Sequence, residues 1–417
     1  MNCGEGQYGY PKKEWTKLFS SNISFEFYTA QNLAVDKDKN SILTFRTNST
    51  LSSNHVHQII LIKVNPNGLP IWTQNFYSYN QYENYSLPNI AVDEFGNILL
   101  VYTNCLKQKE SYINITIIKL SPDGVPIWYQ LQTINNTCEY EILPNVVSDT
   151  FGNFFVGYSF ALFEARAMIQ VHKINPWGGF VWTKQIDSFC GVGEVVNGTT
   201  DENGNYYLTF VEIIYESLLN ENKEPMIRKS RLGTVQVAAV KISSVGSILW
   251  IYNQSILNSS FMDNILSTIF VDKNQNIYLA FNRPETNNGI TFLGGHDLVI
   301  VKLNPSLGIQ WVHTQPFINI TCKYNFPNIT CDEEGNVFMV YESWSTLHPL
   351  LCIPHIFIAM LNPDGIYSWG IQFLSLDTLC YYFAPSISIE DDSIFISYCT
   401  NNKSGDGDIV LEKLIFQ

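Results

Sequence analysis

Carboxylates recur at one position of a repeated turn of the form D-x-x-G-N, where x is any residue. The acids of the copies are Asp36, Asp93, Asp149, Asp201, Asp272, Asp332 and Glu390. Carboxylates can bind calcium, but a loop of the EF-hand type needs more ligands than these turns contain, and a distal glutamate. An Asp in a turn also accepts hydrogen bonds from backbone amides, and a Gly supplies the left-handed conformation that closes the turn. Turn formation therefore explains the acids, and we expect neither a metal ion nor a cofactor.

A second pattern with metal-binding chemistry is the His-x-His pair formed by His55 and His57. Protein zinc sites use three or four side chains, and the spacing of the sequence assigns no third ligand to this pair. The chain has no G-x-S-x-G, H-E-x-x-H or P-loop pattern. The sequence therefore favours a non-catalytic protein, and a catalytic site assembled from several strands is the alternative.

The acids belong to a repeat that fills the chain. A Trp precedes each acid by 19 to 22 residues, at Trp15, Trp72, Trp128, Trp182, Trp250, Trp311 and Trp369. From each acid to the next Trp there are short apolar runs, rich in Ile, Val, Leu and Tyr, and a second turn of the form N-P-x-G or S-P-x-G. Each repeat therefore predicts four antiparallel strands joined by turns and loops.

The third strand of the repeat is a continuous apolar run, such as ITIIKL at 115–120, so both faces of each sheet must be covered. Stacking the sheets radially in a closed ring covers both faces. Residues 14–20 match a fourth strand and the end of the chain matches a third strand, so the two are expected to share one blade. We predict an all-β, seven-bladed β-propeller of four-stranded antiparallel blades, preceded by an extension at 1–13. The predicted blades are 31–78, 88–131, 144–187, 196–254, 266–315, 326–373, and 385–417 with 14–20.

The order of an apolar run with Lys, N-P-x-G, Trp and D-x-x-G-N resembles the bacterial-type seven-bladed β-propeller repeats, the SBBP-repeat family. The residues that carry the resemblance cover essentially the whole chain after about residue 14. Lys39 and Gln275 replace the Gly of the first turn, and residues 243–246 read SSVG in place of N-P-x-G. The resemblance implies the propeller fold but no particular activity.

In such a propeller both kinds of turn lie on one face of the ring, the turn face, and the longer connections lie on the opposite loop face. The loops differ in every repeat, and loops on a rigid scaffold commonly carry binding sites. Residues 344–355 are unusually apolar, and the insertion at 216–234 groups basic residues on an acidic chain. The alternative for residues 344–355 is packing over the blade, and the alternative for the insertion is a solvated hairpin. The predicted contact residues are Trp344, His348, Leu350, Leu351, Arg228 and Arg231.

Polar residues also occur four positions before each turn acid, where the innermost strands begin. They are Asn32, Asn89, Asn145, Asn197, Thr268, Asn328 and Ser386. Such a ring around the channel mouth could bind water, a sugar or an ion. Hydrogen bonding to the backbone of the neighbouring blade is the alternative, and the recurrence in every blade favours it.

Several of the nine cysteines fall on the loop face or its rim. We predict disulfides among Cys105, Cys138, Cys352, Cys380 and Cys399, with free thiols as the alternative. The candidate pairs are Cys105 with Cys138, and Cys380 with Cys352 or Cys399. Eleven N-x-S/T sequons accompany them, which makes glycosylation a second expectation. Both features favour a location outside the cell or on a particle surface, although no signal peptide is visible in the sequence.

Charge narrows the class of partner. The net charge of −14 argues against nucleic acid and anionic membranes, because both need a basic footprint. No apolar run is long enough for membrane insertion. We therefore expect a scaffold or binding protein whose loop face contacts a protein or a glycan. A channel-mouth enzyme acting on carbohydrate and a self-assembling structural subunit are the alternatives.

Overall fold

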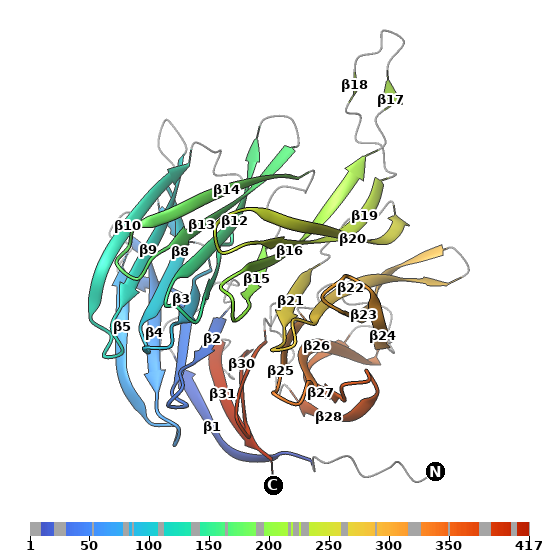
Figure 1. The fold of residues 1–417 in the computed structure, drawn as a ribbon. Helices are drawn as coiled ribbons and strands as arrows, with labels where there is room; N and C mark the ends of the chain where they lie inside the picture. Colours follow the sequence, from blue (N-terminus) through green and yellow to red (C-terminus); the bar gives the residue numbers. More distant parts are fainter. Residues whose placement is uncertain are drawn as a thin grey trace.

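Seven four-stranded antiparallel sheets are arranged as the blades of a propeller (Figure 1), which confirms the predicted fold. The computed structural model describes residues 10–20, 31–51, 54–77, 83–85, 87–106, 112–134, 142–162, 166–188, 196–215, 218–219, 225–226, 233–259, 266–287, 290–315, 327–348, 351–374, 385–401 and 407–416. None of these residues forms a helix that could span a membrane.

The innermost and second strands of blades 1 to 7 are joined by the D-x-x-G-N turns. The innermost strands are β2 (Gln31–Val35), β7 (Asn89–Val92), β11 (Asn145–Ser148), β15 (Asn197–Thr200), β21 (Ser267–Val271), β25 (Asn328–Cys331) and β29 (Ser386–Glu390). The second strands are β3 (Ser41–Leu51), β8 (Ile98–Leu106), β12 (Phe154–Leu162), β16 (Tyr206–Tyr215), β22 (Ile277–Asn287), β26 (Val337–His348) and β30 (Ser393–Asn401).

The third and outermost strands follow in the same blade order. The third strands are β4 (Asn54–Val64), β9 (Tyr112–Leu120), β13 (Arg166–Ile174), β19 (Gly233–Ile242), β23 (Ile290–Leu303), β27 (Leu351–Leu361) and β31 (Gly407–Ile415). The outermost strands are β5 (Pro70–Tyr77), β10 (Pro126–Ile134), β14 (Phe180–Ser188), β20 (Ile248–Ser259), β24 (Ile309–Gln315), β28 (Tyr367–Leu374) and β1 (Lys12–Ser20). Short additional strands are β6 (Glu83–Tyr85), which pairs with β8, and the hairpin of β17 (Leu218–Leu219) and β18 (Pro225–Met226) at the top of Figure 1.

The first described strand closes the ring, as predicted. β1 lies antiparallel beside β31, with Trp15 opposite Lys413, and completes the blade of β29 and β30. The buried carboxylate of Glu412 on β31 reinforces this pairing, because it forms an ion pair with Lys13 at 2.8 Å and accepts a hydrogen bond from Tyr398. Strands from opposite ends of the chain therefore form one blade.

A β-bulge recurs at the start of the outermost strand. The register shifts one residue before the repeat Trp, which then stands opposite the Lys of the third strand, as Trp72 does to Lys63 and Trp182 to Lys173. A bulge bends a strand and changes the direction of the following side chain. The bulge therefore places the Trp beside the Lys of the third strand in six blades, and beside Met360 in blade 6.

The hydrophobic core is divided among the interfaces between blades. Ile42 and Leu61 of blade 1, for example, pack with Ile98 and Leu100 of blade 2, and all four are fully buried. Comparable clusters join the other neighbours, and one cluster spans blades 6, 7 and 1. Every blade therefore needs two neighbours, which is why an open arc would expose apolar faces at both ends.

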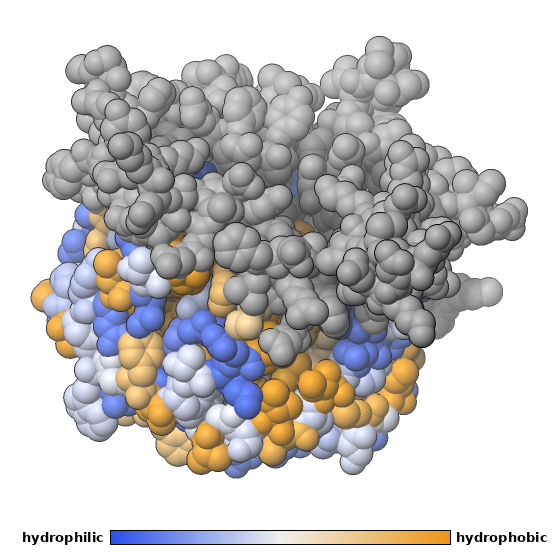
Figure 2. Space-filling model, turned by 90° about the horizontal axis from the view of Figure 1, so that it is seen from above, coloured by the Kyte–Doolittle hydropathy of each residue, from blue (hydrophilic) through white to orange (hydrophobic). Residues whose placement is uncertain are grey.

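The outer surface is chemically mixed. β10 exposes Ile127, Tyr129 and Leu131 at alternate positions, as expected for an edge strand with one face against the blade. Figure 2 shows hydrophobic and hydrophilic residues side by side on the described surface seen from the top of Figure 1. Single exposed apolar residues of this kind need no functional explanation.

Closure can be tested by removing residues 1–20, which deletes β1 and leaves the edge of β31 and the Glu412 carboxylate without their partners. We expect the Tm in differential scanning calorimetry to fall by at least about 5–10 °C, since all blades depend on closure. Removal of residues 1–9 alone keeps β1 and should leave the Tm unchanged. Equal Tm values for the two truncated proteins would show that β1 does not stabilise the ring.

Candidate functional site

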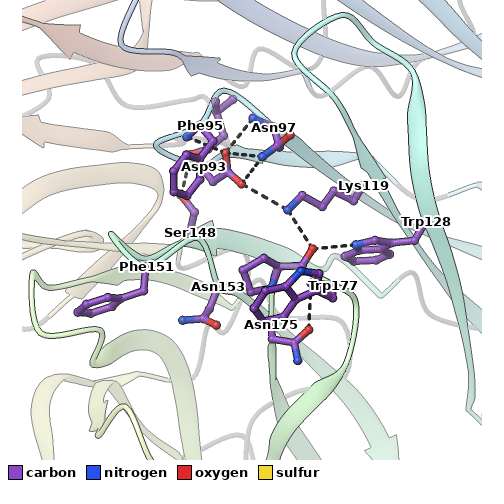
Figure 3. A network of polar contacts seen from close by, with 12 residues as sticks. Asp93, Phe95, Asn97, Lys119, Trp128, Ser148, Phe151, Asn153, Asn175 and Trp177 are labelled. Atoms are coloured by element: carbon purple, nitrogen blue, oxygen red, sulfur yellow. Dashed lines mark hydrogen bonds and ion pairs between the residues drawn. The ribbon is translucent and has the colours of Figure 1, made fainter.

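The turn aspartates accept hydrogen bonds within their own turns. The Oδ1 atom of Asp93 accepts hydrogen bonds from the backbone N–H groups of Phe95 at 3.0 Å and Asn97 at 2.8 Å (Figure 3). The side-chain amide of Asn97 donates to both carboxylate oxygens. Gly96 closes the turn with a φ of 78°, and Lys39 and Gln275 adopt the same left-handed conformation in their turns, as predicted from their positions. The chemistry of these carboxylates is therefore used for structure.

A lysine connects the turn of Asp93 to the next blade. Lys119, which is buried, lies 3.5 Å from the carboxylate of Asp93 and donates a hydrogen bond of 3.1 Å to the backbone carbonyl of Pro176 in blade 3. The indole Nε1 of Trp128 donates to the same carbonyl at 3.2 Å (Figure 3). We call this set of Asp, Lys, Trp and the neighbouring carbonyl the interblade latch.

The latch recurs around the ring. Lys63 and Trp72 of blade 1 bind the carbonyl of Pro122 in blade 2, and Lys173 and Trp182 of blade 3 bind that of Ser244 in blade 4. In the closing blade, Lys413 and Trp15 bind the carbonyl of Pro66 of blade 1, and Lys413 is paired with Glu14 of β1 in place of a turn Asp. The corresponding Asp–Lys distances are 2.9 Å for Lys63 and 3.4 Å for Lys173.

Blade 6 departs from the pattern because no N-P-x-G turn joins the third and outermost strands of the next blade, β31 and β1. Met360 stands where the other blades have Lys, and the Nε1 atom of buried Trp369 finds no acceptor among the described residues.

Burial raises the pKa of Asp332, and the hydrogen bonds from Asn336 offset this only in part. In blade 4 burial acts to raise the pKa of Asp201, but hydrogen bonds from Asn205 and Tyr207 and the charge of Lys241 lower it overall.

The turn face opens into the channel through a depression of about 350 Å³. Its lining includes the turn acids of blades 1 to 5 and Glu390, together with Glu94, Glu202, Lys37 and Lys273. No group of three His, Cys, Asp or Glu residues in the described ranges is arranged to hold a metal ion. The depression is thus an acidic mouth whose turn acids are largely occupied by structural hydrogen bonds.

Three members of the predicted polar ring contact one another across blades. Asn145 donates to Asn197 Oδ1 at 3.4 Å, and Asn197 donates to Thr268 Oγ1 at 3.1 Å. The expected bonds to neighbouring backbone occur three positions later, where Ser148 and Thr200 each donate at 2.7 Å to a carbonyl of the preceding inner strand. Asn32, Asn89, Asn328 and Ser386 occupy the equivalent positions of β2, β7, β25 and β29.

The predicted loop-face contacts are only partly described. Trp344, His348 and Leu351 lie on the hairpin of β26 and β27, where Trp344 is paired with Pro354 and His348 with Leu351. The contacts of these three side chains are outside the described part of the protein. The other predicted contact residues, Arg228, Arg231 and Leu350, also lie outside the described residues.

The predicted disulfides remain predictions. Residues 138 and 380 lie outside the described ranges, and the side chains of Cys105 and Cys352 are not described. Cys399 is buried in the cluster that joins blades 6, 7 and 1. Cys331 on β25 is a free thiol whose pKa is raised by burial, a state of low reactivity.

Two features of the described residues were not predicted from the sequence. His172 is buried in blade 3 between Tyr158 and Thr183, and burial lowers its pKa to about 4, so it is neutral and structural at pH 7. Phe95, Phe151 and Trp177 are exposed on the turn face, with 65%, 60% and 84% of their surface accessible. Their signal in the sequence was an apolar residue at a turn position that is polar in other repeats.

Comparison with known proteins adds support for the fold. No protein-family model and no curated protein sequence matches the chain, so the resemblance to SBBP repeats stays a prediction. The structure is similar to a protein of unknown function from Dyadobacter fermentans DSM 18053, with a TM-score of 0.51 and 11% identity over 98% of this chain and 99% of that one. It is also similar to the polysaccharide lyase Uly1, with a TM-score of 0.52 and 10% identity over 98% and 99% of the two chains. At this identity the likeness concerns the fold alone.

The latch predicts a large effect of Lys119→Met. Methionine retains most of the side-chain volume but leaves the buried Asp93 carboxylate without its cation, so we expect a loss of about 3 kcal/mol in the free energy of unfolding, measured with urea. Adding Asp93→Asn should recover a large part of this loss. Lys37→Met, at an exposed position of the same face, is the control. Equal stabilities of the two lysine variants would contradict the latch.

The contrast between Asp332 and Asp201 predicts opposite pH effects. A raised folded-state pKa makes ionisation of Asp332 destabilising, so its contribution to stability is fully present below the ordinary pKa of 3.8 and is lost as the pH rises through the raised pKa. The Tm of Asp332→Asn should therefore improve relative to wild type as the pH increases across that window.

Asp201, whose pKa is lowered, stabilises the fold above pH 3.8 and loses this contribution as the pH falls through its folded-state pKa. The deficit of Asp201→Asn should therefore shrink toward low pH. Melting curves from about pH 2 to 7 measure both differences. Parallel pH profiles for the two variants would show that the missing lysine of blade 6 has no electrostatic consequence.

Proposed function

We propose that the protein is a non-catalytic binding scaffold that contacts a protein or a glycan through its loop face. The observation that supports this proposal is the difference between the two faces. In blades 1 to 6 the same short turn, such as residues 36–40 or 93–97, joins the first two strands. The connection between the second and third strands varies from two residues at 52–53 to seventeen at 216–232.

The hairpins of blades 1, 5 and 6 extend beyond the outermost strands on the loop face. In blade 6, β28 pairs with β27 only as far as His355, whereas β26 and β27 remain paired out to His348 and Leu351. A hairpin that is already ordered loses little conformational entropy when it binds. The projecting hairpin is therefore suited to present contact residues, and Trp344 lies on it.

A carbohydrate-active enzyme is the second candidate. It is motivated by the likeness along the whole chain to a structure described as a polysaccharide lyase. A lyase leaves an unsaturated sugar at the cleaved end, so incubation with uronate-containing polysaccharides and ultraviolet absorbance measures this activity directly. A rise in absorbance that requires the protein would favour the enzyme over the scaffold. A stable oligomer in sedimentation would instead favour a structural subunit.

The proposed scaffold predicts that Trp344→Ala weakens binding roughly thirtyfold, because an aromatic anchor at a contact typically carries about 2 kcal/mol or more. The Tm should stay nearly unchanged. Glycans from an immobilised array and peptides from a displayed library that bind the wild type serve as probes for titrations with the variant. Trp128→Ala removes a latch residue and should do the reverse, lowering the Tm without a comparable loss of affinity. Unfolding of Trp344→Ala with unchanged binding of the probes would assign Trp344 to the core.

A further inference from the structure

The turn face carries three exposed aromatic side chains that the fold does not require. Phe95 and Phe151 occupy the second x of the D-x-x-G-N turns in blades 2 and 3. The same position is Asp38, Asn203, Asn274 and Glu334 in blades 1, 4, 5 and 6. Because polar residues make the same turn, an exposed Phe there contributes nothing that closure of the turn needs.

Trp177 repeats this pattern in the second kind of turn. It occupies the x of N-P-x-G in blade 3 and is 84% exposed, whereas Asn67, Asp123 and Asp364 stand there in blades 1, 2 and 6. The neighbouring turn of blade 4 has Val245, which is 77% exposed. Apolar replacements are thus concentrated on the turns of blades 2 to 4, which sets this part of the face apart from the rest.

The three aromatic residues lie on neighbouring turns of blades 2 and 3, and we call this set the aromatic ridge. Phe95 lies against the turn of blade 3, so a Cβ added to Gly152 would stand 3.2 Å from its ring and 3.5 Å from Pro176, the residue before Trp177. Phe151 lies in the same way against Gly204 of blade 4, at 3.3 Å. Figure 3 shows Phe95, Phe151 and Trp177 around the latch of blade 2. The latches hold these turns, so the ridge is rigid.

The charges around the ridge identify the chemistry of its partner. The six turns of blades 2 to 4 contain no Lys or Arg. They are residues 93–97, 121–125, 149–153, 175–179, 201–205 and 243–247. Their exposed carboxylates are Glu94, Asp123 and Glu202. The remaining acids of these turns, Asp93, Asp149 and Asp201, are paired with buried lysines. The exposed charged side chains of these six turns are therefore all negative.

We propose that the aromatic ridge is a second binding surface that docks a basic, partly apolar polypeptide segment of a partner protein. Lysine and arginine side chains are attracted to aromatic faces, most strongly to Trp, and Glu94, Asp123 and Glu202 supply the opposite charge. Two copies of this chain would bring like charges together at the ridge, which disfavours self-association there. This surface is separate from the loop face, so it goes beyond the proposed function and does not depend on it.

The test uses a short fluorescent peptide of alternating lysine and leucine, with a glutamate–leucine peptide as the charge control. The variant is Phe95→Asn, Phe151→Asn and Trp177→Asn combined, which introduces the residue found in Asn203, Asn274 and Asn67 at equivalent positions. It therefore keeps both the turns and the net charge. Ile366→Asn, an exposed apolar residue on the turn face of blade 6, is the matched control.

We expect the wild type and Ile366→Asn to bind the basic peptide alike, and the triple variant to bind at least about tenfold more weakly at an unchanged Tm. Trp344→Ala should bind the basic peptide as the wild type does, which separates this surface from the loop face. Equal binding by the triple variant, no binding by the wild type, or equal binding of both peptides would overturn the proposal. So would a wild-type dimer, or affinity for an immobilised polysaccharide, that the triple variant loses.

Discussion

The structure depends on lysines that are buried between neighbouring blades and bind polar groups on both. Lys119 has the Asp93 carboxylate on its own blade and the Pro176 carbonyl on the next, and Trp128 shares that carbonyl. A buried charge is costly unless an opposite charge and hydrogen bonds compensate it. Here the compensation exists only when neighbouring blades are docked in one register. Burying the ion pair is therefore favourable in only one relative position of two neighbouring blades. The apolar clusters between blades cannot define this position alone.

The ring does not repeat this contact at the joint between blades 6 and 7, where β31 and β1 are not consecutive strands. The joint between blades 6 and 7 lacks the turn that would supply a carbonyl, and Met360 and buried Trp369 occupy the latch positions there. The apolar cluster that spans blades 6, 7 and 1 joins this region, and Trp369 packs near Phe338 and Phe416. Hydrophobic packing takes the place of the charged contact at this joint. Closure itself is then held on the other side by Lys13, Glu412 and the latch of Trp15.

The same constraints separate stability from recognition. Within each turn, the Asp, the Asn and the left-handed Gly are fixed by hydrogen bonding and backbone conformation, and the prolyl carbonyl is fixed by the latch. The x positions carry no such role, so a replacement there changes the surface without changing the fold. The exposed Phe95, Phe151 and Trp177 all lie at x positions of turns that are closed by hydrogen bonds. A rigid support of this kind limits the entropy that a bound partner must offset.

The sequence by itself determined the repeat, the number of blades, the shared closing blade and the left-handed positions of Lys39 and Gln275, because these follow from local turn chemistry and spacing. The partners of the latch are about 50 residues apart in sequence and meet only when blades pack, so the pattern showed Asp, Lys and Trp but not their contact. The bulge before each Trp, the raised pKa of Asp332 and the neutral His172 likewise arise from packing. The sequence shows the three aromatic residues of the ridge, but their exposure and their position on neighbouring turns of blades 2 and 3 follow from the tertiary structure, since only the ring places those turns side by side.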